Sequence, residues 1–121
     1  MRFRSGFESS FATFLENNKV DYEYEKHSIT FVPKIRRYTP DFYLLDHDMF
    51  IETKGLFTSA DRAKHLLIKD QHPEMDIRFI FQRANQRLYK GSKTTYSQWC
   101  DKHGFKHSES EIPRSWLKTR T

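Results

Sequence analysis

The sequence feature that most strongly constrains the fold is a pair of apolar runs separated by a polar turn. Residues 41–45 and 49–54 alternate in the way of strands, and residues 46–48 between them are polar. Pairing Leu44 with Met49 would close the two runs into an antiparallel hairpin. The sequence therefore predicts a short β-hairpin at the centre of the fold.

Three ionisable residues interrupt these apolar runs. Side chains alternate along a strand, so Glu52 and Lys54 point to the same face of the hairpin. The register predicts that Asp41 lies opposite Glu52 on that face, and not beside Thr53 on the other. Charges at buried positions are costly unless they are paired or bind a metal, so this arrangement favours a chemical function.

The remaining patterns predict an α/β fold in which helices flank a small mixed sheet. Helices are expected at 6–17, 60–71 and 96–103, with a last helical turn after Pro113. Further strands are expected at 20–25, 28–32 and 77–81. The stretch from 49 to 81 is long enough for a right-handed crossover, so its two strands should be parallel. Helical spacing places Ala60, Ala63, Leu66 and Leu67 on the inner side of the second helix.

Composition limits the class of protein and its partners. The chain has 121 residues, enough for one domain, and its single cysteine excludes an intrachain disulfide framework. No apolar run is long enough to span a membrane and no signal peptide is recognisable, so a cytoplasmic protein is expected. The net charge of +5 favours a polyanionic partner, most often nucleic acid, over a generic soluble surface.

Two carboxylates beside a lysine are typical of metal-assisted hydrolysis of a phosphodiester. Carboxylate oxygens suit Mg²⁺ or Mn²⁺, which polarise a phosphoryl group and lower the pKa of a bound water. Lys54 can orient that water and stabilise the developing negative charge. The alternative is a surface ion pair on an edge strand, which contributes ~0–1 kcal/mol. Because Asp41, Glu52 and Lys54 are embedded in apolar runs, the nuclease interpretation is favoured.

Pro40-Asp41 followed by Glu52-Thr53-Lys54 resembles the signature of the PD-(D/E)xK nuclease superfamily. Longer segments resemble the phage endonuclease I family, which resolves Holliday junctions and other branched DNA. The segments are 3–8, 38–42, 52–56, 61–68, 71–74, 88–92 and 100–104. The resemblance implies a restriction-endonuclease-like core and a Mg²⁺-dependent endonuclease, with Mn²⁺ able to substitute. It further implies paired nicks at four-way junctions, made by a metal-bound water.

The family pattern also implies roles for individual residues. It makes Asp41 and Glu52 metal ligands, with the Thr53 carbonyl completing the site, and it makes Lys54 the catalytic lysine. Glu8 matches a further catalytic acid. Spacing alone instead places Glu8 in a capping box at the start of the first helix, and the two roles are compatible.

The resemblance implies an intertwined homodimer in which Glu8 of one chain completes the site on the other chain's hairpin. Residues 28–38 are extended with little to pack against locally, so they are the predicted bridge. They would join a first helix and strand, 1–27, to a catalytic core, 39–121, within one nuclease domain, 1–121. Relatives carry longer basic extensions, which leaves open how much DNA affinity the ends of this chain supply.

Basic side chains are candidates for contact with DNA phosphates, which position a protein without specifying sequence. They are Arg2, Arg4, Arg36, Arg37, Arg62, Lys64, Lys69, Lys90 and Lys93, and His65 is predicted to join them. The histidine spacings fit no zinc motif, and no small-molecule cofactor is expected. Two alternatives stay open: a sequence- or mismatch-directed nuclease of the same superfamily, and a non-catalytic DNA-binding module.

Overall fold

The predicted hairpin forms the centre of the sheet in the computed structural model, which describes residues 2–31 and 35–118. Strand β4 (Phe42–Leu44) pairs antiparallel with β5 (Met49–Lys54), and Leu44 lies opposite Met49. The predicted register is therefore confirmed. Strand β6 (Ile77–Phe81) pairs parallel with β5, as the crossover through the intervening helix requires.

Five strands make the main sheet, in the order β1-β4-β5-β6-β7. The outer strands are short: β1 (Tyr22–Tyr24) pairs antiparallel with β4, and β7 (His107–Glu109) pairs parallel with β6. The sheet is thus mixed, as predicted. Strand β7 was not expected from the sequence, because its residues are polar and only pairing with β6 identifies it.

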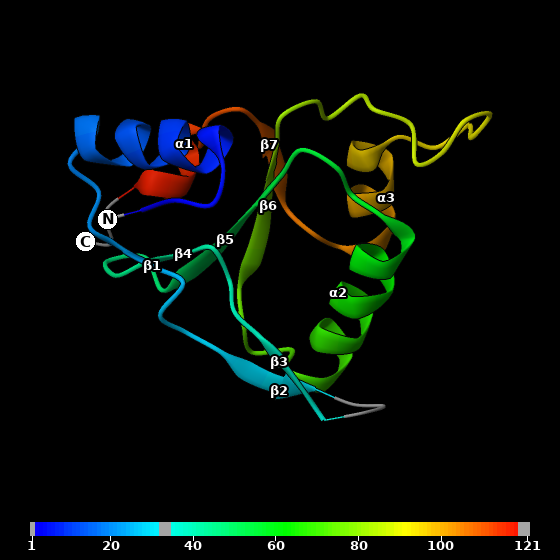
Figure 1. Cartoon of the computed structure of the whole chain (residues 1–121), viewed down its shortest axis with the longest axis horizontal. Coiled ribbons are helices and arrows are strands. Elements are labelled where there is room, and N and C mark those ends of the chain that lie inside the picture. The colour runs from blue at the N-terminus through cyan, green and yellow to red at the C-terminus, as the bar shows by residue number, and fades with distance from the viewer. Residues whose placement is uncertain (1, 32–34, 119–121) are drawn as a thin grey trace.

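Helices flank both faces of this sheet (Figure 1). They are α1 (Gly6–Asn17), α2 (Ser59–Gln71), α3 (Tyr96–His103) and a short 3-10 helix η1 (Arg114–Leu117). Residues along β6 alternate between the two faces: Ile80 packs with the core of α1, whereas Phe79 and Phe81 pack with that of α3. None of the helices in residues 2–31 and 35–118 is long and apolar enough to cross a membrane.

The helices begin with capping groups, but the capping box predicted for Ser5 and Glu8 is only half formed, because the Glu8 side chain accepts instead from the Arg4 N–H. The side chain of Ser5 accepts a hydrogen bond from the Glu8 N–H at the start of α1, and Thr58 caps α2. Thr95 and Gln98 form a capping box at the start of α3. Gly104 ends α3 with a φ of 77°, a left-handed conformation that favours glycine.

Residues 28–38 do not match their predicted environment. Strand β2 (Ile29–Phe31) pairs antiparallel with β3 (Arg36–Tyr38), and the pair forms a separate two-stranded sheet. Phe31 and Tyr38 are buried against Ile68 and Ile77. The expectation that this segment has little to pack against locally is therefore wrong, although residues 32–34 of the predicted bridge lie outside the described part of the chain.

The inner side of α2 also differs from its prediction. His65 and Ile68 are the buried residues of this helix, whereas Ala60 and Ala63 are exposed and Leu66 is 37% exposed. The His65 ring packs against three other aromatic rings, those of Tyr38, Phe79 and Phe105. A polar residue type thus fills an aromatic core position, which the apolar spacing of α2 did not reveal.

The buried imidazole of His65 should make folding stability depend on pH. Burial, followed by the charges of Lys64 and Lys54, lowers the pKa of His65 from 6.5 to about 3. Between these pH values the unfolded chain binds the proton and the folded chain does not, so this contribution to stability is lost as pH falls. As pH falls through this window, the free energy of unfolding of wild type should decrease more steeply than that of His65→Leu, an apolar variant of similar size. The difference in slope should reach up to ~1.4 kcal/mol per pH unit.

Denaturant unfolding of both proteins at a series of pH values measures this difference. Using the difference between the two profiles removes the contribution of the carboxylates, which titrate in both proteins. Parallel profiles between pH 3 and 6.5 would show that His65 is protonated equally in the folded and unfolded chains.

Candidate functional site

Asp41 and Glu52 come together where β4 begins and β5 ends. Both side chains are buried, with Asp41 1% and Glu52 5% exposed. Asp41 Oδ2 accepts hydrogen bonds from the Thr53 N–H, at 2.9 Å, and from the Thr53 hydroxyl, at 2.8 Å. The prediction that Asp41 avoids Thr53 is therefore wrong. Asp41 lies just before β4, so strand alternation does not fix the direction of its side chain.

Glu52 and Lys54 share a face of β5, as predicted. Lys54 Nζ lies 3.5 Å from Glu52 Oε2 and 3.3 Å from Asp61 Oδ1. On the other side, the buried Tyr38 hydroxyl donates a hydrogen bond of 2.8 Å to Glu52 Oε1. Glu52 is thus held between a phenol from β3 and the lysine, and the sequence pattern did not identify Tyr38 or Asp61 in these roles.

Glu8 reaches the same group from the first turn of α1. It is 5% exposed, and its Oε1 accepts hydrogen bonds from the Tyr24 hydroxyl at 2.9 Å and the Arg4 N–H at 3.1 Å. Carboxylate oxygens of Glu8, Glu25 and Asp41 lie within 4.8 Å of one another. All of them belong to one chain, so in this structure the carboxylates meet without a second copy.

Arg4 lies among these acidic side chains. Its Nη2 is 3.0 Å from Asp41 Oδ1 and 3.4 Å from Glu8 Oε2, and its Nε pairs with Glu25. Neither the pairing of Arg4 nor the presence of Glu25 was predicted. Glu25 follows a strand with alternating polar residues, and no local signal distinguishes it from a solvent-exposed acid.

The buried charges perturb one another strongly. Burial and the charge of Glu52 raise the pKa of Asp41 to about 8, against the hydrogen bonds from Thr53, which lower it. Burial also raises the pKa of Glu52, although Lys54 and Tyr38 act in the other direction. Burial lowers the pKa of Lys54, but the charges of Glu52 and Asp61 outweigh it and the net pKa is raised. Two desolvated carboxylates of this kind favour the binding of a cation.

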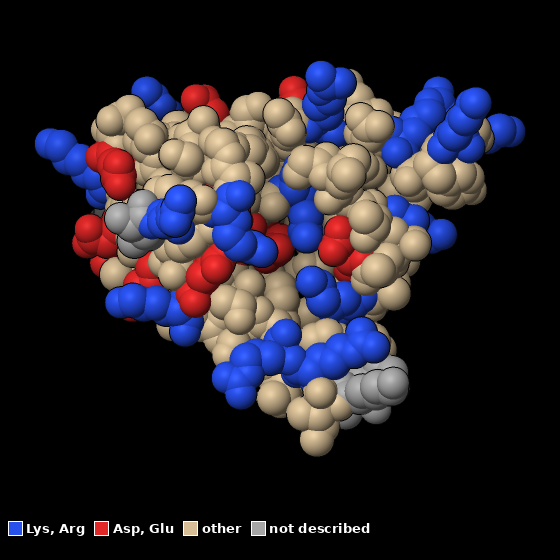
Figure 2. Space-filling model, in the orientation of Figure 1, with Lys and Arg blue, Asp and Glu red and all other residues tan. Residues whose placement is uncertain are grey.

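The group lines a surface pocket of about 310 Å³. Its walls come from the start of α1, the end of β5 and the segment after β6: Arg4, Ser5, Phe7, Glu8, Asp41, Glu52, Thr53, Lys54, Gly55 and Gln82. Figure 2 shows acidic side chains near the centre of one face, with Lys and Arg side chains around them. The site therefore combines buried carboxylates with a basic surrounding surface.

The basic side chains predicted to contact DNA occupy different environments. Arg36 and Arg37 are exposed on β3, and Lys90 and Lys93 on the loop before α3. Others are tied to the protein: Arg62 Nη1 donates to the Phe57 carbonyl, Lys69 Nζ to that of Gly104, and Lys64 Nζ lies over the Tyr38 ring. Arg2 is exposed. His65 is fully buried, so the predicted contact of this side chain with DNA is not available in this structure.

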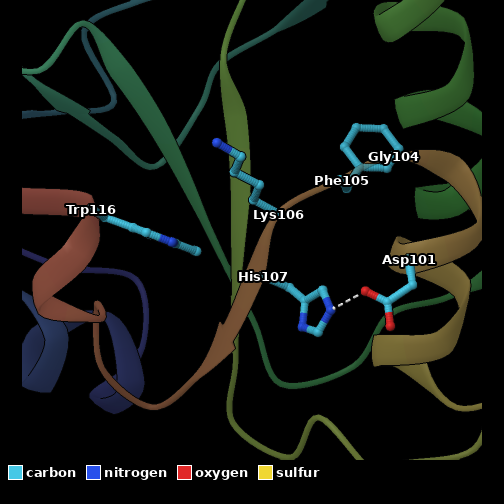
Figure 3. A pocket seen from close by; sticks show the side chains of 6 residues that line it. All are labelled: Asp101, Gly104, Phe105, Lys106, His107 and Trp116. Atoms are coloured by element: carbon cyan, nitrogen blue, oxygen red, sulfur yellow. Dashed lines mark hydrogen bonds and ion pairs between the residues drawn. The ribbon is translucent and has the colours of Figure 1, made fainter.

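A second pocket, of about 430 Å³, lies apart from these carboxylates (Figure 3). Trp116 of η1, Lys106 and His107 at β7, and Asp101 of α3 line it, and His107 Nε2 hydrogen-bonds Asp101 Oδ1 at 2.8 Å. Cys100, on the same helix as Asp101, is buried in the aromatic core. None of the predicted catalytic residues lines this second pocket.

Comparisons with known proteins identify the family. The chain belongs to the phage endonuclease I family, whose model matches residues 1–121. It is 48% identical over 118 residues to Endonuclease I of Escherichia phage T7, an alignment that covers 96% of this chain and 78% of the relative. It is also 48% identical to Endodeoxyribonuclease 1 of Enterobacteria phage T3, covering 96% of this chain and 77% of that protein. The family resemblance predicted from the sequence is confirmed.

Removing the Tyr38 hydroxyl tests how the site holds Glu52. We expect Tyr38→Phe to lower the free energy of unfolding by ~1–3 kcal/mol, because Glu52 Oε1 loses a buried donor while the ring packing is kept. Tyr43→Phe is the matched control, since its hydroxyl donates to Asp48 at an exposed position. That variant should stay within ~0.5 kcal/mol of wild type. Equal losses in denaturant unfolding would contradict a special role of Tyr38.

Proposed function

We propose that this protein is a Mg²⁺-dependent DNA endonuclease that resolves four-way junctions and other branched DNA by paired nicks. The observation that carries the proposal is the buried pair Asp41 and Glu52 beside Lys54, in a pocket open to the surface. Membership of the phage endonuclease I family supports the same class of reaction. The proposed place of action is the host cell cytoplasm, because both relatives are encoded by phages.

The donor set fits a hard divalent cation. Asp41 and Glu52 offer carboxylate oxygens, which Mg²⁺ and Mn²⁺ prefer, and the Thr53 carbonyl stays the predicted third ligand. The raised pKa of Asp41 reflects unfavourable burial of negative charge, which a cation would relieve. The guanidinium of Arg4 already pairs with Asp41, so the pocket accommodates positive charge. A bound Mg²⁺ would supply charge neutralisation at a phosphate and a more acidic water.

Lys54 is prepared for a cationic role. Its raised pKa keeps the ammonium protonated at neutral pH, and Glu52 and Asp61 fix its position. A protonated Nζ beside the carboxylates can hold a phosphate oxygen and stabilise the charge that develops during in-line attack by water. Glu8 and Glu25 add acidic groups on the other side of Asp41.

We further propose a restriction-endonuclease-like core and a homodimer that uses two equivalent sites. A junction with two-fold symmetry presents two equivalent phosphates, which a two-fold symmetric protein can cut in pairs. Exchange of segments between the chains is compatible with the site, because Glu8 and the hairpin are separated in sequence by β1, β2 and β3. A partner's Glu8 would then take the place that the chain's own Glu8 has here.

Two alternatives make different demands on the site. A sequence- or mismatch-directed nuclease of the same superfamily would use the same carboxylates but bind a linear duplex as tightly as a junction. A non-catalytic DNA-binding module would have no need of Asp41, Glu52 and Lys54 together in a pocket. The presence of all three favours an active nuclease.

Cleavage of a labelled four-way junction in Mg²⁺ tests the proposed reaction. Replacing Glu52 by the neutral, similarly shaped glutamine should lower the cleavage rate by two orders of magnitude or more, since it removes a proposed ligand. The variant should still bind the junction, as measured by fluorescence anisotropy, because the basic surface is unchanged. Cutting at the wild-type rate by a folded Glu52→Gln protein would contradict the assignment of Glu52 as a metal ligand.

Mixing two inactive variants tests whether the sites are shared between chains. If Glu8 acts on the partner's hairpin, a mixed dimer of Glu8→Ala and Lys54→Ala chains has one intact site and one doubly damaged site. It should therefore nick one strand of the junction. If each site belongs to one chain, both sites of the mixed dimer are damaged and no nicking should occur. Gel analysis of single nicks distinguishes the two results.

A further inference from the structure

Two large apolar side chains, one of them just after the β5 residues of the candidate site, are exposed to solvent. Tyr89, on the loop between β6 and α3, is 65% exposed, and Leu56, just after β5, is 72% exposed. Both line one surface hollow of about 580 Å³, together with the loop residues around Tyr89 and the ring of Tyr96. Neither residue belongs to the cores described above, so packing does not explain why the two lie together.

The loop that carries Tyr89 is held in shape by its own backbone. The Leu88 N–H donates to the Thr94 carbonyl at 3.0 Å, and the Tyr96 N–H to the Gln86 carbonyl at 2.9 Å. At the tip, the Ser92 N–H donates to the Tyr89 carbonyl at 3.0 Å. This turn needs a left-handed residue at its third position, which Gly91 supplies with a φ of 87°. The exposed ring is therefore presented by an ordered turn, which limits the entropy lost on binding.

The charge around this ring indicates a polyanionic occupant. Residues 82–100 contain four basic residues, Arg83, Arg87, Lys90 and Lys93, and no Asp or Glu. All four are exposed. The loop protrudes from the upper right of Figure 1, and Figure 2 shows basic side chains gathered at that corner. Arg87 also donates to the Ser92 carbonyl and supports the turn. Lys90 and Lys93 lie closest to the tip, and among the described residues neither makes a hydrogen bond of this kind.

The hollow follows the candidate site along the chain: Gly55 lines the pocket of the site, and Leu56 lines the hollow. Leu56 follows Lys54 by two residues, and the Gly55 between them lines the catalytic pocket. The next residue, Phe57, donates its N–H to the Tyr96 hydroxyl at 3.2 Å, which fixes this segment against α3. A nucleic acid with a phosphate at Lys54 would therefore extend past Leu56 toward the loop.

We propose that Tyr89 and Leu56 form a stacking surface for the base-pair face that is exposed where DNA helices branch. Lys90 and Lys93 would hold the phosphates beside that face. Base faces are flat and apolar in every sequence, so this contact recognises an uncovered base and not a sequence. Inside a continuous duplex each base is covered by its neighbours, so the surface adds affinity where stacking is interrupted, as at a branch point. The inference rests on the proposed function, because it places the scissile phosphate at Lys54.

Binding without cleavage tests the stacking surface. Fluorescence anisotropy in EDTA compares a four-way junction with a linear duplex of equal arm sequence, for wild type and three full-length variants. Tyr89→Ala should weaken junction binding about tenfold and leave duplex binding unchanged, whereas Tyr89→Phe keeps the ring and should behave as wild type. Lys90→Ala is the matched phosphate variant. It should weaken both complexes by a similar factor and lower the salt dependence by about one ion.

A fluorescent base analogue at the branch point gives a second readout. Its emission should change on binding of wild type and Tyr89→Phe, and much less on binding of Tyr89→Ala. Equal thermal unfolding midpoints show that the variants are folded. A Tyr89→Ala protein that keeps both its junction preference and the emission change would overturn the stacking surface.

The remaining outcomes separate this inference from the proposed function. If wild type binds the junction and the duplex equally, the proposed junction preference is wrong. The stacking surface is then tested by the emission change alone, compared between wild type and Tyr89→Ala. No emission change with wild type overturns the stacking surface even if the junction is cut. A Tyr89→Ala protein with unchanged DNA affinity but an altered oligomeric state would assign the hollow to a second copy of this chain, which also overturns it.

Discussion

Two carboxylates, Asp41 and Glu52, are buried beside the end of β5, and the surrounding strands must supply their partners. Removing Asp41 and Glu52 from water costs several kcal/mol per ion unless partners compensate each charge. Thr53 supplies two donors to Asp41, and Tyr38 and Lys54 both contact Glu52. These partners come from β3 and β5, so the two carboxylates have their hydrogen-bond donors only when these strands are in place.

The hydrogen-bond donors around the buried carboxylates of Asp41 and Glu52 compensate their burial only in part. Thr53 and Tyr38 donate hydrogen bonds that satisfy part of each carboxylate, but the pKa of Asp41 and that of Glu52 are still raised by burial. The remaining free-energy cost of burying the two negative charges is what a bound cation would reduce. A fully compensated site would be more stable and would bind a metal more weakly, which is the usual conflict between stability and function.

Local signals predicted the elements that carry this site. The register of β4 and β5 follows from the alternation around Leu44 and Met49, and α3 spans the expected residues 96–103. Strands β3 and β7 were missed because each has three residues of mainly polar character. Such strands are stabilised by pairing with a neighbour, which a single sequence does not show.

Contacts within the site were harder to predict than its members. Asp41, Glu52 and Lys54 are recognisable from their spacing, but the hydrogen bond from Tyr38 to Glu52 joins residues on two different sheets. The placement of Arg4 beside Asp41 depends on how α1 packs across the sheet. His65 was assigned to the surface by residue type, and only the aromatic rings around it explain its burial.

Helix α1 carries both a core stripe and Glu8, the proposed catalytic acid, and the two together bear on when the proposed nuclease can act. Phe11 and Leu15 dock α1 onto the sheet, and Glu8 lies one turn before Phe11 on the same helix. Docking of the helix and completion of the carboxylate group are therefore a single event. A newly made chain whose α1 has not yet docked would lack Glu8 at Asp41, so hydrolytic competence would arrive only with the finished fold and partly folded chains would spare the DNA around them.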